Sequence, residues 1–217
     1  MHPILRLYED TISGGAAQLR LPALPRMIFV VHGSAIIGGQ TLSDGEAWHG
    51  EGAAAIAPGK DGVTLWRFAL TAAGGSGDLP GPGVRSQEKL SAILDTIPPG
   101  ELLLRGDSVG FPPGGCAYPH KHAGPGIRCL IEGGIRIDTH GRSTSYGPGS
   151  AWYETGTDAV FAQAAMDRPS RFIRVMVLPR SLLGKSSFQF VNEEDKAKPR
   201  AQQYKVFADA PIAMPKG

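Results

Sequence analysis

The sequence predicts an all-β protein built from two similar units, and three observations support this. The chain has 30 glycines and 18 prolines among its 217 residues. Its Val, Ile, Phe and Trp residues gather in short runs between these turn-forming residues, as in sandwiches and barrels. Similar residues also recur about 100 positions apart along the chain. The length is sufficient for one large β domain or for two of about 100 residues.

The first half of the chain contains most of the expected elements of one such unit. Residues 1–25 are interrupted by glycine and proline, so we expect an arm or edge strands there. Apolar runs typical of strands follow at 27–31, 35–37, 45–48 and 63–70. After a Gly/Pro-rich stretch, Ser86 is expected to cap a short helix over residues 87–94, where Leu90, Ile93 and Leu94 have helical spacing.

The second half repeats the first at a nearly constant offset. A shift of 100 aligns Pro25 with Pro125 and Gly33 with Gly133, and a shift of 104 aligns Trp48 with Trp152 and Arg67-Phe68 with Arg171-Phe172. The four extra residues would lengthen a turn, where insertions cost little. We therefore divide the chain into an N-terminal unit (1–80), a linker with the short helix (81–101), a C-terminal unit (102–180) and a tail (181–217).

The tail and the composition limit the class of protein. Two alternating runs at 187–191 and 203–207 are expected to add to a sheet edge, in the same chain or in a partner, which is compatible with a homodimer. A net charge of +2 without a basic run argues against nucleic-acid binding. Charges interrupt the first apolar stretch, no run is long enough to cross a bilayer, and two cysteines make no disulfide framework. We expect a cytoplasmic protein.

The clearest chemical feature is the pair His120 and His122. Residues two apart on a strand share a face, so both imidazoles would project together. They can chelate a metal ion if further groups converge on them. The alternative is a pair of surface histidines near a turn. The apolar run that follows, ending at Gly133-Gly134, favours a barrel wall.

The residues around this pair resemble the motifs of the cupin superfamily, and with the internal repeat the chain resembles a bicupin. Gly114, six positions before His120, matches the opening glycine of the first motif, and Gly133 matches its closing glycine. Pro148-Gly149 matches the start of the second motif. The resemblance covers most of residues 102–178 and, more faintly, 20–70. It implies a double-stranded β-helix (jelly-roll) barrel in each unit, but it says little about the reaction.

Two of the four usual cupin ligands are absent. Gly126 stands where the family has a glutamate, and Ala159 where it has a further histidine. In the N-terminal unit, Arg20 and Pro22 replace the paired histidines, so that unit is degenerate and any metal site lies in the C-terminal one.

Nearby residues offer a way to rebuild a site. Glu154 could replace the missing carboxylate and complete a two-histidine, one-carboxylate set that suits Fe²⁺, with Mn²⁺, Ni²⁺ or Zn²⁺ as alternatives; otherwise it is an exposed residue before a turn. If the alternation continues, Gly126 and Arg128 face inward. Gly126 would leave room beside the histidines, and Arg128 would hold a carboxylate or phosphate, or else form a surface ion pair.

The remaining candidates line the expected pocket. Tyr118 has the same parity as the histidines and could hydrogen-bond a ligand or carry a proton, although wall tyrosines often only pack. Trp152, Phe161 and Phe111 would supply apolar walls.

Three functional hypotheses follow. The first is a metal-dependent cupin enzyme of the dioxygenase type that oxidises a small anionic organic molecule. In it, His120, His122 and Glu154 hold the metal and Arg128 orients the anion. The second is a cupin that has lost its metal and binds a small ligand as a sensor or storage protein. The third is isomerase or lyase chemistry at the same metal without O₂.

Overall fold

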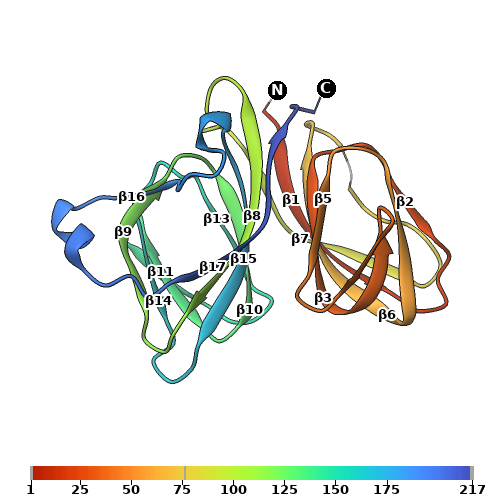
Figure 1. The fold of residues 1–217 in the computed structure, drawn as a ribbon, viewed down its shortest axis with the longest axis horizontal. Coiled ribbons are helices and arrows are strands. Elements are labelled where there is room, and N and C mark those ends of the chain that lie inside the picture. Colours follow the sequence, from red (N-terminus) through yellow and green to blue (C-terminus); the bar gives the residue numbers. More distant parts are fainter. Residues whose placement is uncertain (1, 76, 216–217) are drawn as a thin grey trace. The chain divides into compact units, whose positions relative to one another are not determined.

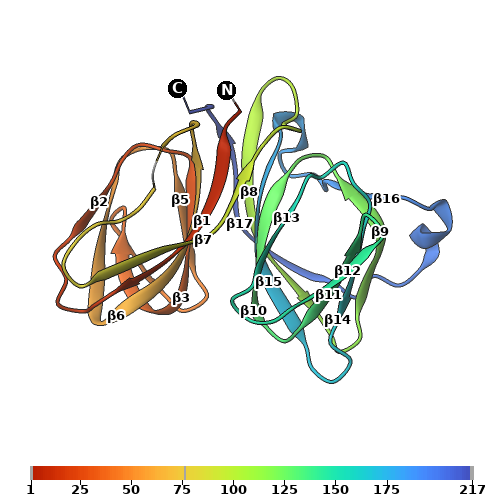
Figure 2. The same cartoon turned by 180° about the vertical axis from the view of Figure 1, so that it is seen from behind.

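The computed structural model describes residues 2–75 and 77–215, and it forms two compact units that consist mainly of β-strands (Figures 1 and 2). Unit 1 contains the chain up to Asp95 together with the chain from Ile212 onward, and unit 2 is Thr96–Pro211. No helix in the described residues is both long enough and apolar enough to cross a membrane.

Unit 1 is built on one sheet with the strand order β4-β3-β6-β1-β7, to which β2 and β5 add at β6 and β3. The strands are β1 (Ile4–Ile12), β2 (Leu19–Leu21), β3 (Arg26–Ile37), β4 (Gln40–Ser43), β5 (Ala47–Gly50), β6 (Ala54–Thr71) and β7 (Val84–Ile93). Buried aliphatic side chains, among them Ile28, Leu65 and Ile56, form the core of this unit. This burial is the main term that stabilises it.

Two expectations for the N-terminal half were wrong. Residues 87–94 are not a helix, because Val84–Ile93 is strand β7, paired antiparallel with β1. Ala92 and Leu94 are buried while Ile93 is 61% exposed, which is a period of two rather than a helical one. The expectation of an arm or edge strands at residues 1–25 fails for β1, which lies between β6 and β7, although the short strand β2 pairs with β6 alone and does lie at an edge. A short apolar run fits both a helical period and the strand period of two. Here the edge of β1 offers hydrogen-bonding partners, so the run forms a strand.

Unit 2 consists of two five-stranded sheets, with the orders β13-β10-β15-β8-β17 and β12-β11-β14-β9-β16. The strands are β8 (Leu102–Phe111), β9 (Cys116–His122), β10 (Gly126–Glu132), β11 (Ile135–Thr139), β12 (Arg142–Tyr146), β13 (Ala151–Glu154), β14 (Val160–Ala164), β15 (Ser170–Pro179), β16 (Phe188–Phe190) and β17 (Gln203–Ile212). One apolar cluster joins side chains of both sheets, such as Phe111 and Phe172 from the first and Ile137 and Ala162 from the second. The core therefore lies between the sheets.

The two units share one strand order. The path β5-β3-β6-β1-β7 of unit 1 corresponds to β13-β10-β15-β8-β17 of unit 2. In each unit one residue pairs with a tryptophan on one side and an arginine on the other: Ile28 with Trp48 and Arg67, and Arg128 with Trp152 and Arg174. The register therefore agrees with the predicted match of the tryptophans. It makes Arg174, not Arg171, the counterpart of Arg67.

The tail after β15 wraps around unit 2. It runs through the short turn η1 (Arg180–Leu182), strand β16, the turn η2 (Glu193–Ala197) and strand β17. Strand β16 pairs with β9 and β17 joins β8, so the two alternating runs of the tail extend the sheets of their own chain.

Candidate functional site

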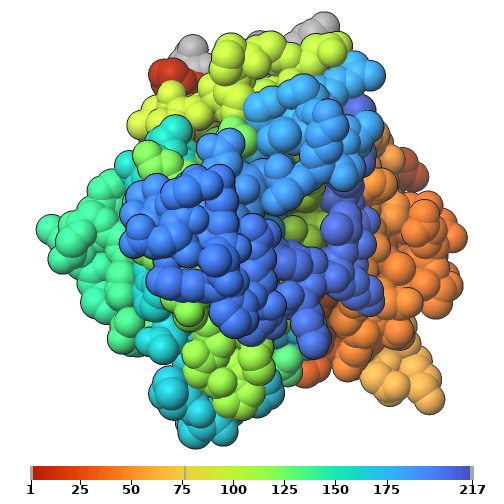
Figure 3. Space-filling model, turned by 60° about the vertical axis from the view of Figure 1, so that its left-hand side comes forward, coloured from red at the N-terminus to blue at the C-terminus, as the bar shows by residue number. Residues whose placement is uncertain are grey.

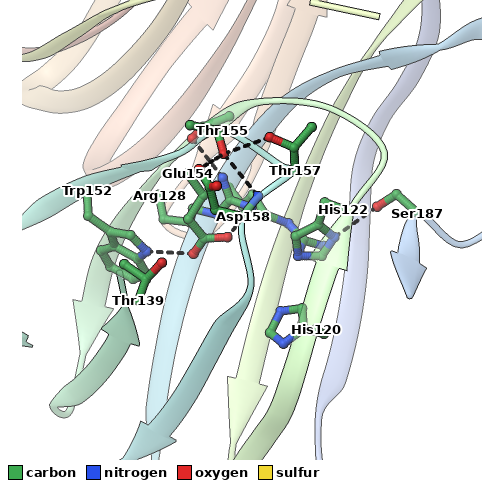
Figure 4. Close-up of polar contacts among 12 residues, drawn as sticks. His120, His122, Arg128, Thr139, Trp152, Glu154, Thr155, Thr157, Asp158 and Ser187 are labelled. Carbon is green, nitrogen blue, oxygen red and sulfur yellow. Dashed lines mark hydrogen bonds and ion pairs between the residues drawn. The ribbon is translucent and has the colours of Figure 1, made fainter. Parts of the chain in front are cut away.

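The two histidines project into the interior of unit 2 from strand β9. His120 and His122 are each 6% exposed, and their ring centroids are 5.0 Å apart (Figure 4). They are not surface histidines, and the strand places them on one face as the spacing predicts.

Tyr118 does not share that face, so this expectation was wrong. The pairing of β9 with β14 joins His120 to Val160 but Ala117 to Ala162, so three steps on β9 match two on β14. Such a bulge reverses the parity of the residues before it. Ala117 is therefore buried with the histidines, whereas the half-buried ring of Tyr118 contacts the Lys198 ammonium at 4.4 Å.

Hydrogen bonds fix the tautomer of both histidines. His120 Nδ1 lies 2.8 Å from the Tyr118 carbonyl oxygen, which can only accept, so Nδ1 carries the proton and Nε2 keeps a lone pair. His122 Nε2 lies 3.4 Å from Arg174 Nη1, which can only donate, so the His122 proton is also on Nδ1, 3.2 Å from Ser187 Oγ. Burial lowers the pKa of both rings, and the Arg174 charge lowers that of His122 further, so both are neutral.

Glu154 is held by an arginine rather than free to bind a metal. Strand register places Glu154 directly opposite Gly126, so its carboxylate comes beside the position where the family has its glutamate. However, Glu154 Oε2 lies 2.8 Å from Arg128 Nη2, and Oε1 accepts a hydrogen bond of 2.9 Å from Trp152 Nε1. Arg128 is 1% exposed and also donates to the Gly126 carbonyl oxygen at 2.7 Å. Burial lowers the Arg128 pKa to about 10, so it stays charged at neutral pH.

A second buried ion pair lies beside the histidines, and the sequence interpretation missed it. Arg174 Nε and Nη2 donate to Asp107 Oδ1 and Oδ2 at 2.9 and 2.6 Å, across directly paired positions of β15 and β8. Burial disfavours the charge of Arg174, but the Asp107 carboxylate outweighs this and raises its pKa. The available signal was the presence of charged residues of opposite sign, Asp107 and Arg174, within two mostly apolar strands, because buried charges require a partner.

Two adjoining chambers open around these groups, and His122, Arg174, Phe188 and Tyr204 line both. The inner chamber, which His120, Glu154 and Trp152 also line, has a volume of only about 20 Å³, room for about one water molecule. Phe188 stacks on His120 with centroids 4.3 Å apart and occupies the space next to it. The outer chamber has a volume of about 370 Å³. In Figure 3 its mouth is the hollow between the light-blue segment after β15 and the indigo strand β17.

Comparison with known proteins identifies the fold and nothing finer. No family model matches the chain, and no curated protein matches it. A mutant of Bacillus subtilis oxalate decarboxylase is 12% identical, with 89% of this chain and 73% of that chain covered and a TM-score of 0.63. The oxalate decarboxylase formate complex of Lactobacillus farciminis is 13% identical, with 92% and 82% covered and a TM-score of 0.63. A cupin 2 conserved barrel domain protein from Leptotrichia buccalis is 12% identical, with 81% and 84% covered and a TM-score of 0.50. The chain has a cupin fold.

Two predicted pocket residues of this cupin fold have other roles. A Cβ on Gly126 would lie 2.4 Å from the Val175 carbonyl oxygen, so the glycine allows two strands to approach, and its missing side chain does not leave open space. Phe161 points away from the interior, because Val160 and Ala162 are the buried residues of β14, and the Arg136 guanidinium lies 5.7 Å from its ring. Trp152 and Phe111 do line the inner chamber, as expected.

The residues present do not fit the divalent metal that cupin motifs imply. Within residues 2–75 and 77–215, no group of three His, Cys, Asp or Glu side chains is placed to hold an ion. The histidines have the tautomer that metal ligands adopt, with Nδ1–H bonded to another group. However, both Glu154 oxygens are engaged, and the Arg174 guanidinium faces His122 Nε2. Two guanidinium charges beside the ligands would repel a divalent cation.

Proposed function

We propose that unit 2 is a cupin-fold module that binds a small organic anion without a metal ion. This corresponds to the second hypothesis from the sequence. The observation that carries it is the buried ion pair of Arg128 and Glu154, because the carboxylate that a metal would need already neutralises an arginine. Freeing Glu154 for a metal would leave a guanidinium buried and unpaired, which is strongly unfavourable.

The outer chamber supports a small anionic ligand. Arg174 Nη1 carries two N–H groups and directs one at His122 Nε2, 3.4 Å away, so the other can still donate to a ligand at the chamber wall. Arginine donors suit carboxylates and phosphates. The named substrate or ligand of the similar solved structures, oxalate or formate, is also a small carboxylate.

Unit 1 is proposed to be a duplicated copy with a structural role. Its strand order repeats that of unit 2, and aliphatic side chains form the core at its centre.

The sequence suggested a homodimer because the tail strands could pair with a partner chain. Both tail strands pair within their own chain, so they no longer support a homodimer. Sedimentation analysis of the purified protein tests it.

A second candidate function is proton transfer without a metal, as in an isomerase or lyase. His120 favours it, because its Nδ1–H is fixed on the Tyr118 carbonyl oxygen and its Nε2 lone pair is left on a ring that lines the inner chamber. A neutral imidazole held in this way can act as a general base. The inner chamber would have to widen to admit a substrate.

The test combines metal analysis with ligand binding. Purified protein, reconstituted with Fe²⁺, Mn²⁺, Ni²⁺ or Zn²⁺ and then dialysed, is expected to retain substoichiometric metal. At a fixed concentration, small carboxylates that bind more tightly are expected to raise the melting temperature more, with the logarithm of affinity. One tightly bound ion per chain that is lost in Glu154→Gln would overturn the proposal and restore the metal-enzyme hypothesis.

A further inference from the structure

We propose that the outer chamber of unit 2 selects monocarboxylates with an apolar body. The inference rests on the proposed function and names the ligand class of the same site. It follows from the charges, the hydrogen-bond donors and the apolar walls of the chamber, which lie on β8, β15, β17 and the segment from Gly184 to Phe188.

The charges that line the chamber leave one positive charge without a counterpart. They are Arg105, Arg174 and Lys185 against Asp107 and Asp209. Arg174 pairs with Asp107, and Arg105 pairs with Asp209 at 2.9 Å. In the described part of the chain, Lys185 forms no ion pair and its side chain is exposed at the chamber edge. A ligand with a single negative charge would therefore neutralise the chamber, whereas a dianion would bring one unpaired charge.

Fewer hydrogen-bond donors are free to bind a ligand than the number of positively charged residues in the chamber suggests. Arg105 uses its guanidinium on Asp209 and on the carbonyl oxygens of Lys185 and Leu182, at 2.6 Å each, so it is satisfied. Arg174 has only Nη1 to offer. Ser187 Oγ accepts from His122, which leaves its own proton to donate. These two donors and the Lys185 ammonium suit one carboxylate group.

The chamber also has an apolar part of its wall. Tyr204 and Val206 are 54% and 58% exposed on β17, and both line the chamber together with Phe188. Exposed apolar side chains that face a cavity are commonly covered by a ligand. A volume of about 370 Å³ is at the lower end of small-molecule pockets, about 300 to 1,000 Å³. It fits a molecule of the size of an aromatic or short branched acid.

Calorimetric titration with three probes that share one ring tests the inference on the full chain: benzoate, benzyl alcohol and phthalate. Benzoate is expected to bind at least about tenfold more tightly than the neutral and the dianionic probe. Lys185→Gln is expected to weaken benzoate severalfold and to leave benzyl alcohol unchanged. Lys205→Gln, which removes the same charge from an exposed residue of β17 outside the chamber lining, is the matched control and should change neither.

The outcomes separate this inference from the proposed function. Equal affinity for benzoate and benzyl alcohol, tighter binding of phthalate, or an equal effect of the two lysine substitutions would each overturn the monocarboxylate class. So would the absence of binding by all three probes. None of these results depends on metal content, which alone decides whether the module works without an ion.

Discussion

Arg128 Nη2 lies 2.8 Å from Glu154 Oε2 in the interior of unit 2, and this pair stands where the sequence predicts a metal ligand. The side chains are 1% and 8% exposed, so water screens their interaction little. Breaking such a pair from one side leaves a buried charge, which costs more than the pair itself contributes.

Replacing Arg128 is therefore expected to destabilise the protein strongly. Arg128→Met should lower the free energy of unfolding by about 3–5 kcal/mol, because Glu154 loses its counter-charge. Arg128→Met with Glu154→Gln should recover much of this loss. Urea denaturation measures both, and Arg136→Met provides the control, because that arginine forms an exposed pair worth about 0–1 kcal/mol. Equal losses in the two single variants would contradict the buried-pair account.

The same substitution is expected to raise the affinity of unit 2 for a divalent metal. With Arg128 removed, one oxygen of Glu154 is free beside the two histidines, so that three side chains are available to ligate an ion. Equilibrium dialysis should show that Arg128→Met gains Zn²⁺ affinity over the wild type, and that adding Glu154→Gln removes the gain. If the wild type binds Zn²⁺ as tightly as Arg128→Met, the guanidinium does not exclude the metal.

The buried histidines should make stability depend on pH in the mildly acidic range. Their pKa values are lower in the folded chain than the ordinary value of 6.5, so above that pH both states are neutral and stability is constant. As pH falls below 6.5 the unfolded chain binds protons first, and the free energy of unfolding should fall by up to about 1.4 kcal/mol per pH unit for each histidine. Denaturation between pH 7 and 5 measures the slope, which His122→Asn should reduce. His49, whose pKa burial also lowers, keeps its contribution in both proteins.

Gly126 should tolerate no side chain. Gly126→Ala would place a Cβ 2.4 Å from the Val175 carbonyl oxygen, so β10 and β15 must separate and the melting temperature should fall by several degrees. Gly147→Ala, with nothing within 4 Å of its Cβ, is the control and should have little effect. A stable Gly126→Ala protein would instead support the roomy pocket that the sequence suggested.

Phe188 should control how closed the inner chamber is. Phe188→Ala removes the ring stacked on His120 and admits water, so the pKa of His120 should rise towards its ordinary value. An NMR titration of the imidazole signals measures this shift. Phe190→Ala, on the same strand but outside the lining of both chambers, should leave the pKa unchanged. An unchanged titration in Phe188→Ala would show that Phe188 does not exclude water from His120.

Much of the fold could be predicted from the sequence, because turn residues and apolar runs are local signals. Strands β3, β5, β6 and β10 and the two tail strands follow such runs. The helix prediction at 87–94 failed because a strand-pairing partner, β1, lies some 80 residues earlier in the chain. A local period cannot report an edge formed so far away.

The site was less predictable, because its chemistry depends on register. The inward direction of His120, His122 and Arg128 follows from alternation along a strand. The contact between Glu154 and Arg128 depends on how β13 aligns with β10. The contact between Arg174 and Asp107 depends in the same way on how β15 aligns with β8. Spacing within one strand contains no information on either alignment.

The bulge of β9 also determines how the strand would respond to a change of length. The segment from Ala117 to His120 has one residue more than its partner strand requires. A single-residue deletion between these two residues would leave two steps on each strand, so the bulge would disappear while Ala117 and both imidazoles stayed on the inner face. Homologous chains that are one residue shorter at this point would therefore keep the same inner surface, and only the outward-facing residues of the segment would differ.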